Sequence, residues 1–535
     1  MKILPIVPLN RVLKLLLFLL FPVFLMAQRN DPNEDLRKLQ FALQIINYAY
    51  VDSVHEDELV ETAIVEMLKE LDPHSIYIPK EDLQRANEPL QGNFEGIGVQ
   101  FEILKDTIVV VHPLPGGPSE KLGIIAGDKI VKIDGEDVVG KLVNNQFVLD
   151  HLRGKRGTKV SVSIYRKGKK NLLDYVITRD KIPINSIDAV YMIAPGIGFI
   201  KLNRFSLTTT GEFQDAVKKL KSEGMQDLIL DLRNNAGGYM APAIEISDEF
   251  LGLGKIIVYT EGMRSKRENF YSTFRGDFES GKLVIMINEN SASSSEIVAG
   301  AVQDWDRGLI VGRRSFGKGL VQRPYNLPDS SQIRLTTARY HTPSGRYIQK
   351  PYKNGVEEYY KDFANRYSRG ELVHADSIKL PDSLKYRTGN GRTVYGGGGI
   401  MPDVFIPWDS TFLTDYYLDV RRNNIVNPIV SEYIDKNRQY LLKEYPDFAS
   451  YNSNFTVGET LMELFFKAAG DADMEMNEEE FTISEPLIKA QIKGLIAQKL
   501  YDITSFYIIA NEMDPEVTRT IRIIQDDSQF QELTR

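Results

Sequence analysis

LVIMINENSASSSEIVAG, residues 283–300, decides the class of fold expected for the centre of this chain. Its five leading apolar residues, 283–287, predict a strand that is buried on both faces. A polar turn follows, and residues 296–302 predict a helix. A strand that passes through a short turn into a helix is the repeating unit of α/β folds.

The surrounding sequence extends this pattern in both directions. Residues 183–350 predict an α/β region, because strands are expected at 198–200 and 228–232 with a helix at 212–223 between them. Residues 30–90 and 410–535 have apolar residues at helical spacing, and 92–180 predict a small β-rich domain. We interpret the four glycines at 396–399 as a flexible loop.

The composition excludes several classes of protein. The chain has 535 residues, of which 42% are hydrophobic and 26% charged, which is typical of a multidomain globular protein. Its formal net charge of −8 argues against non-specific binding of nucleic acid. There is no cysteine, and the six histidines are scattered without an HExxH motif. We therefore predict no metal site and no organic cofactor.

The N-terminus has the pattern of a secretory signal peptide. Lys2, Arg11 and Lys14 precede an apolar run at 15–27. This run is shorter than the roughly 20 residues that span a bilayer, and it fits the apolar core of an export signal. We expect cleavage after Ala27 and a periplasmic or secreted mature protein. An uncleaved membrane anchor is the alternative, because Leu25 is large for the −3 position.

A serine at the start of the predicted helix is a candidate nucleophile. Ser293 lies where the first N–H groups of a helix have no intrahelical partner and attract negative charge. An oxyanion formed on a substrate would be stabilised there. The alternative is structural, because Ser293 and Glu296 have the spacing of a capping box.

Lys318 is a candidate general base. It lies between two glycines at the entry to a predicted strand, and alternation along that strand puts Lys318 and Gln322 on one face. A lysine accepts a proton at neutral pH only if desolvation lowers its pKa well below about 10.4. A surface lysine in a glycine turn is the alternative. The FGKG sequence is not a phosphate-binding loop, because the pattern GxxxxGK[ST] is absent.

A second turn between a strand and a helix, DLRNNAGG at 231–238, contains two adjacent glycines. Gly237 and Gly238 can present backbone N–H groups to an oxyanion. A glycine-rich turn is also common in α/β folds without that role. Each of these three elements is a weak signal alone, and their joint occurrence is much less likely to arise by chance.

Taken together, these motifs resemble those of the C-terminal processing (tail-specific) serine peptidases. The resemblance covers roughly residues 30–408. It rests on residues 291–297, on FGKG followed by Val321-Gln322, and on DLRNNAGG. Further matching motifs are LDPHS at 71–75, TARY at 337–340, TPSGR at 342–346 and GGIMPDV at 398–404.

The resemblance implies a Ser-Lys dyad that works without histidine. By the motifs of the family, Ser293 is the nucleophile, Lys318 is the base and Gln322 orients the lysine. Glu296 matches a position that is implicated in some members. Ser291 and Ser295 are less favoured as nucleophiles.

An oxyanion hole is also expected from the resemblance. Backbone N–H groups near Gly237, Gly238 and Ser294 would form it. Two departures from the family pattern are Ser294, where a small residue such as alanine is usual, and Ala236, where proline or serine often stands. Neither departure removes a catalytic group.

The family carries a PDZ domain before its core, which fits residues 92–180. PDZ domains capture the C-terminal carboxylate of a peptide that adds to the sheet as a strand. The candidate carboxylate-binding loop is formed by Gly96, Ile97, Gly98 and Val99. A plain glycine turn that leads into a strand is the alternative.

We therefore expect a multidomain α/β protein. The predicted parts are a signal peptide (1–27), a helical segment (28–91), a PDZ domain (92–180), an α/β peptidase core of the ClpP/crotonase-like type (181–408) and a helical C-terminal extension (409–535).

The expected function is a serine endopeptidase that cleaves proteins near their C-termini, with the tail bound by the PDZ domain. Its expected partners are proteins with free C-termini. The extension at 409–535 could hold an adaptor protein or form a homodimer, and it equally fits structural packing. The alternative function is a non-catalytic PDZ scaffold, against which an intact Ser293, Lys318 and Gln322 argue.

Overall fold

The chain divides into two compact units, Met1–Leu71 and Asp72–Arg535. The computed structural model describes residues 33–140, 143–273 and 276–534, so the expected signal peptide lies outside the described residues. The described part of the first unit holds helices α2 (Glu34–Ala49) and α3 (Glu56–Lys69). Across the described ranges, no helix is long and apolar enough to span a membrane.

The second unit contains a β-rich domain with a six-stranded antiparallel sheet of order β3-β4-β5-β7-β8, in which β6 pairs with β5. Alternate residues of β3, β4, β7 and β8 point into one core, which α6 covers with Val148 and Leu152. A ribbon of β2 and β9 pairs the start of the domain with its end. The bounds are β2 (Asn93–Gly96), β3 (Val99–Leu104), β4 (Thr107–Pro113), α5 (Pro118–Lys121), β5 (Lys129–Ile133), β6 (Glu136–Asp137), α6 (Asn145–Leu152), β7 (Lys159–Tyr165), β8 (Leu173–Thr178) and β9 (Asp180–Pro183).

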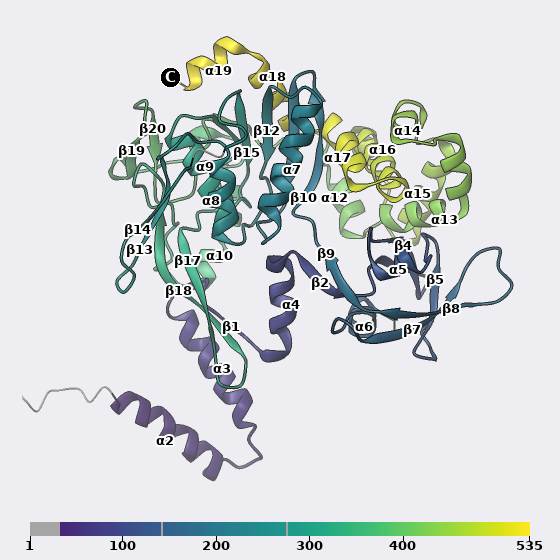
Figure 1. Cartoon of the computed structure of the whole chain (residues 1–535), viewed down its shortest axis with the longest axis horizontal. Helices are drawn as coiled ribbons and strands as arrows, with labels where there is room; N and C mark the ends of the chain where they lie inside the picture. The colour runs from purple at the N-terminus through teal and green to yellow at the C-terminus, as the bar shows by residue number, and fades with distance from the viewer. Residues whose placement is uncertain (1–32, 141–142, 274–275, 535) are drawn as a thin grey trace, which may run out of the picture. The chain divides into compact units, whose positions relative to one another are not determined.

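The α/β core is built on a six-stranded sheet of order β10-β11-β12-β15-β16-β21 (Figure 1). Only the pair β10-β11 is antiparallel among these described strands. Helices α7, α8 and α9 cover one face, where Ile285 and Ile287 point, and α18 and α19 cover the other, where Val284 and Met286 point. This double cover explains why β15 is apolar throughout. The bounds are β10 (Ile187–Ala194), β11 (Ile197–Leu202), α7 (Thr209–Ser222), β12 (Asp227–Asp231), α8 (Met240–Asp248), β15 (Leu283–Ile287), α9 (Ser294–Asp304), β16 (Leu309–Gly312) and β21 (Val404–Phe405).

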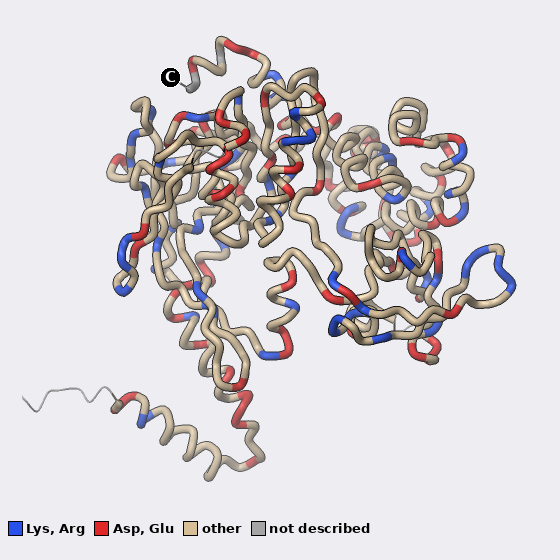
Figure 2. The backbone as a smooth tube through the Cα atoms, viewed as in Figure 1, with Lys and Arg blue, Asp and Glu red and all other residues tan. Residues whose placement is uncertain are grey.

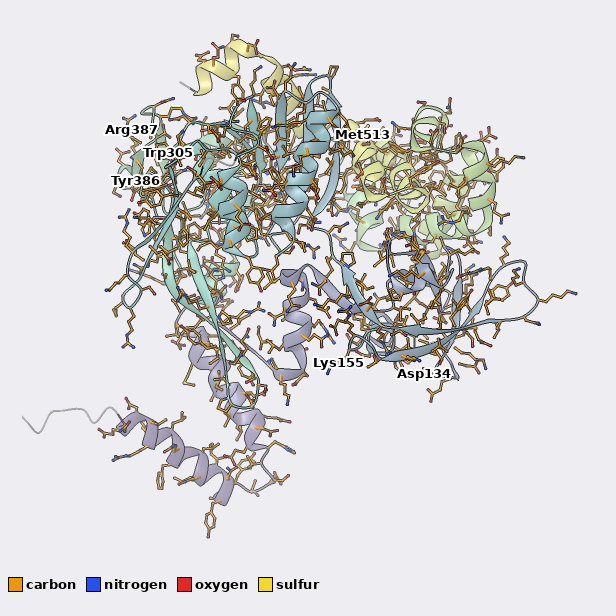
Figure 3. The ribbon with its side chains drawn as sticks, in the orientation of Figure 1. Asp134, Lys155, Trp305, Tyr386, Arg387 and Met513 are labelled. Carbon is orange, nitrogen blue, oxygen red and sulfur yellow. The ribbon has the colours of Figure 1, made fainter. Side chains whose placement is uncertain are left out.

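A second sheet of the core carries the lysine motif. It has the order β1-β18-β13-β14, and β17 pairs with β18. At the end of α9, the indole N–H of Trp305 donates to the carbonyl of Ile256 in β13, which joins the helix to this sheet (Figure 3). The bounds are β1 (Ile76–Ile78), α4 (Lys80–Gln91), β13 (Ile256–Glu261), β14 (Glu268–Tyr271), β17 (Leu320–Asn326), β18 (Gln332–His341), α10 (Val356–Tyr360), α11 (Asp362–Ser368), β19 (Lys385–Arg387) and β20 (Thr393–Tyr395), with 3₁₀ turns at Ala375–Ser377 and Asp382–Leu384.

The C-terminal region is helical. Helices α12 to α17 enclose a core of their own, in which Ile488, Ile492 and Ile496 form the stripe expected from the sequence. Lys and Arg are interspersed with Asp and Glu along the second unit (Figure 2), so charge alone does not mark a binding face. The bounds are α12 (Asp415–Arg422), α13 (Val426–Glu444), α14 (Phe448–Asn454), α15 (Glu459–Asp471), α16 (Glu478–Leu500), α17 (Ile503–Glu512), α18 (Pro515–Gln525) and α19 (Asp527–Thr534).

Two local expectations differ from the structure. Residues 76–78, which were expected within a helical segment, form strand β1, because they pair with β18 far along the chain. The four-glycine stretch is not a free loop. The amides of Gly397 and Gly399 donate to the carbonyls of Tyr347 and Ile348, and a Cβ on Gly399 would lie 2.7 Å from Ser315. These glycines permit close packing of the backbone.

Candidate active site

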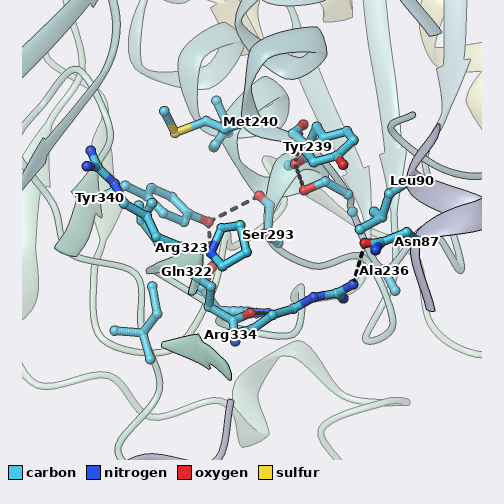
Figure 4. A pocket seen from close by; sticks show the side chains of 18 of the residues that line it. Asn87, Leu90, Ala236, Tyr239, Met240, Ser293, Gln322, Arg323, Arg334 and Tyr340 are labelled. Atoms are coloured by element: carbon cyan, nitrogen blue, oxygen red, sulfur yellow. Dashed lines mark hydrogen bonds between the residues drawn. The ribbon is translucent and has the colours of Figure 1, made fainter. Parts of the chain in front are cut away.

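Ser293 is the serine of its loop whose position suits nucleophilic attack. It links β15 to α9 with φ at 56°, in the left-handed region that side chains rarely adopt. Ser293 and Ser294 line a cavity of about 410 Å³ (Figure 4). In contrast, the hydroxyls of Ser291 and Ser295 are buried and donate to the carbonyls of Leu232 and Asn235.

Lys318 lines the same cavity as Ser293. Its Nζ donates to Oε1 of Gln322 at 2.9 Å. Burial lowers the pKa of the Lys318 ammonium, although the carboxylates of Asp72 and Glu296 oppose that shift. Among the described residues, Nζ makes no hydrogen bond to the Ser293 hydroxyl. The lysine is therefore held by Gln322 and not by the serine.

Strand alternation alone does not explain why Lys318 meets Gln322. β17 begins only at Leu320, and its register with β18 shifts between Val321 and Gln322. The register skips Thr337, so the extra residue lies in β18 and not in the strand that carries Gln322. The two side chains meet as expected, where the chain turns at Gly317, whose φ is 89°.

Glu296 connects the nucleophile loop to the lysine loop. It is fully buried in α9, and its carboxylate accepts from the amides of Ser293 (2.8 Å), Gly317 (2.7 Å) and Lys318 (2.8 Å) and from the Ser315 hydroxyl. Burial raises the pKa of Glu296, and these donors oppose the rise. The contacts assign Glu296 a positioning role, in which it fixes the backbone on both sides of the cavity.

The two glycines of DLRNNAGG contribute differently to the site. The amide of Gly237 already donates to Oδ1 of Asn235 at 2.9 Å, so it is not available to an oxyanion in this structure. A Cβ there would lie 3.0 Å from the amide nitrogen of Ser294, so the missing side chain keeps that amide open. Among the described residues, the amides of Gly238 and Ser294 have no hydrogen-bond partner.

Ion pairs around Asp231 stabilise the first residues of this glycine loop. Arg233 contacts Asp231 and also Asp514 and Glu516, which lie at the N-terminal end of α18. Burial alone would raise the pKa of Asp231, but the nearby charges of Arg233 and Lys201 lower it to about 2. The loop is therefore tied to a segment nearly 300 residues away along the chain.

Three residues that had no predicted role hold the catalytic candidates in place. The amide group of Gln322 donates to the carbonyl of His74, and the hydroxyl of Tyr340 donates to the carbonyls of Lys318 (2.6 Å) and Ser293 (3.1 Å). The carboxylate of Asp72 accepts from the amides of His74 and Ser75. The LDPHS and TARY motifs were the signals that could have pointed to these residues.

No histidine is among the described residues that line the cavity. Burial and the charge of Lys318 lower the pKa of His74 to about 4, and its ring is hydrogen-bonded to Tyr359. His341 is stacked on Tyr259 with ring centroids 4.7 Å apart. Neither ring is placed to take a proton from Ser293.

A groove on the β-rich domain contains most of the predicted peptide-binding loop. Ile97, Gly98 and Val99 line a largely apolar cavity of about 360 Å³ between β3 and α6. Gly96 is instead paired with Asp180 in the β2-β9 ribbon. Gly98 has φ at 73°, and a Cβ there would lie 2.8 Å from Ile182. The outer edge of β3 has no partner strand among the described residues.

Four family models match the chain. The model described as peptidase family S41 matches residues 196–361, and that of the PDZ domain matches 96–176. The N-terminal domain of the activating protease CtpB matches 25–82, and a family of unknown function matches 416–502.

Named relatives agree with these models. The chain is 36% identical over 343 residues to a carboxy-terminal-processing protease of Bartonella bacilliformis, covering 62% of this chain and 78% of that protein. It is 35% identical over 318 residues to a probable CtpA-like serine protease of Staphylococcus aureus, covering 59% of this chain and 62% of that protein.

Among solved structures, the photosystem II D1 C-terminal processing protease is 30% identical. The match covers 58% of this chain and 89% of that chain, with a TM-score of 0.33. The family models and the relatives show that the chain belongs to the carboxy-terminal-processing proteases of peptidase family S41, and that it is a serine-type peptidase.

Proposed function

We propose that Ser293 and Lys318 form the catalytic dyad of this peptidase and that Gln322 orients the lysine. The observation that carries the proposal is the shared cavity, where Ser293 lies with a partly buried lysine and without a histidine among the described lining residues. Burial lowers the pKa of Lys318, which favours the neutral amine that a base must offer.

The hydrolysis would proceed in two steps. Ser293 Oγ attacks the carbonyl carbon of the substrate while its proton passes to neutral Lys318 Nζ, and the lysine then gives that proton to the leaving amine. Water, deprotonated by the same lysine, next attacks the acyl carbon; as the bond to Ser293 Oγ breaks, the lysine returns that proton to Oγ and the free enzyme is restored. For the first proton transfer the amine has to turn from Gln322 toward Ser293, and Gln322 keeps it within the cavity.

The oxyanion would be stabilised by the open amides of Gly238 and Ser294. Ser294 is the first residue of α9, so its amide also carries the favourable dipole of the helix N-terminus. Removing one oxyanion donor typically raises the barrier by about 2.7–4 kcal/mol. In this arrangement Gly237 acts by leaving space for the Ser294 amide.

We further propose that the PDZ domain recognises the C-terminal tail of a protein substrate. The apolar groove between β3 and α6 fits an apolar terminal side chain, and the unpaired edge of β3 fits an added strand. The export signal at residues 1–27 makes the periplasm or the extracellular space the proposed location.

Covalent labelling tests the assignment of the nucleophile. A fluorophosphonate probe should modify Ser293, as identified by mass spectrometry of the digested protein, and S293A should lose the label. S291A is the matched control and should keep it. Labelling that persists in S293A would overturn the assignment.

A comparison of substrate ends tests tail recognition separately. One peptide substrate with a free C-terminus should be cleaved faster at low concentration than the same peptide with an amidated C-terminus. Equal rates would remove the PDZ proposal and leave the dyad proposal standing.

A further inference from the structure

A second cavity, of about 620 Å³, lies between the PDZ domain and the C-terminal helices. On one side it is lined by residues 100–104 of β3, and on the other by residues of α13 and α16, including Ser431 and Lys499. Hydrogen bonds from Ser431 and Lys499 to the carboxylate of Glu102 join the two sides. The helices thus form a wall beside the strand that is expected to pair with substrate.

This cavity shares part of its lining with the apolar groove. Gln100 and Phe101 of β3 line both. The groove lies at the start of β3, next to the predicted carboxylate-binding loop, and the second cavity lies along the rest of the strand. A chain that leaves the groove along β3 would enter the second cavity.

The second cavity differs from the groove in its chemistry. Its charged groups are already compensated, because Lys499 Nζ lies 2.7 Å from Glu102, and burial lowers the pKa of His112, which favours the neutral ring. Side-chain amides donate and accept hydrogen bonds without net charge. Six such amides line it: Gln100, Asn144, Asn145, Asn424, Asn427 and Gln498.

We propose that this cavity binds the segment of a substrate that precedes its C-terminal residues, in extended form and with polar, uncharged side chains. The proposal rests on the proposed tail recognition by the PDZ domain. It makes the C-terminal helices part of the substrate-binding surface.

The geometry of strand addition sets the length of peptide that is needed. A peptide antiparallel to β3, with its carboxylate at Gly98, advances about 3.3 Å per residue along the six residues of β3. Its last four residues lie in the apolar groove. The preceding residues lie beside Glu102 to Leu104 and face the amides of the second cavity.

Peptide length and one substitution together test the proposal. The full-length S293A protein is titrated, by fluorescence anisotropy, with a labelled four-residue peptide and with a ten-residue peptide that has the same apolar C-terminus and Ser, Thr and Asn upstream. The longer peptide should bind roughly tenfold more tightly, which corresponds to one or two net hydrogen bonds. Q498W in the S293A background fills the cavity and should abolish this gain while leaving the four-residue affinity unchanged. Q146W, on the exposed side of α6 and outside both cavities, is the matched control and should leave the gain intact.

The outcomes separate the two proposals. Equal affinities of the two peptides, or a gain that survives in Q498W, would overturn the second site and leave tail recognition standing. Failure of both peptides to bind would overturn tail recognition and, with it, the site that rests on it. Unchanged binding of the four-residue peptide shows that Q498W is folded.

Discussion

Replacing Glu296 by glutamine tests whether this residue positions the catalytic groups. The carboxylate accepts four hydrogen bonds, two at Oε1 from Ser315 and Gly317 and two at Oε2 from Ser293 and Lys318. A glutamine can keep one pair with its carbonyl oxygen. Its NH₂ group then faces the two remaining donors, which are left unpaired in a buried site.

The expected magnitude follows from these contacts. A buried hydrogen bond to a charged group contributes about 1.5–3 kcal/mol, so losing two lowers the free energy of unfolding by about 3–6 kcal/mol. This is a large part of the roughly 5–15 kcal/mol that stabilises a typical domain. Because misplacing a catalytic group by about 1 Å can cost on the order of a hundredfold in rate, we expect kcat to fall by about that factor while KM changes little.

Urea denaturation and steady-state kinetics measure the two effects. Fluorescence of Trp305, at the end of α9, reports unfolding of the core in a Trp408→Phe background, since the chain has two tryptophans. E279Q, which changes an exposed glutamate in the same domain, is the control and should leave both quantities unchanged. An E296Q protein with wild-type stability and wild-type kcat would refute the positioning role.

Four further changes probe the surroundings of the lysine and the glycine loop. Asp72 raises the pKa of Lys318, so Asp72→Asn should shift the acid limb of the kcat–pH profile to lower pH; a shift to higher pH would contradict this electrostatic role. Gln322→Glu places a carboxylate beside Nζ of Lys318, which should raise the lysine pKa and move the same limb to higher pH. Gln322→Ala should lower kcat less than the loss of the lysine does. Glu516→Gln weakens the ion pairs to Arg233 and Arg313 and should lower the free energy of unfolding by about 3 kcal/mol, as measured by urea denaturation. An unchanged free energy of unfolding would show that Asp514 and Glu289 compensate.

Local patterns in the sequence were sufficient to predict the elements around the candidate dyad. The apolar run at β15 and the polar turn after it predicted a strand, a turn and a helix, and the structure has each of them. Ser293, Lys318 and Gln322, which the resemblance to the family singled out, line one cavity. These predictions succeeded because strand burial, turn composition and helix capping are encoded within a few residues.

Contacts between distant segments could not be predicted in this way. Gln322 bonds to His74, which is 248 residues away, and Arg233 bonds to Glu516, which is 283 residues away. The hydrogen bond from the Gly237 amide to Asn235 depends on the rotamer of the Asn235 side chain, which no sequence pattern specifies. The wall that α13 and α16 form beside β3 likewise depends on how separate domains pack.

The dependence of kcat on pH tests the Ser-Lys mechanism most directly. It is measured for the wild type, S293A, K318A and K318R, and circular dichroism checks that each protein is folded. Activity of the wild type should rise with pH as Lys318 loses its proton, with a midpoint below the ordinary lysine pKa of about 10.4, because burial disfavours the ammonium. S293A and K318A should be folded and at least about a hundredfold slower. K318R should be equally impaired, because a guanidinium stays protonated. A folded K318A protein with near-wild-type turnover would contradict the account and would require another base.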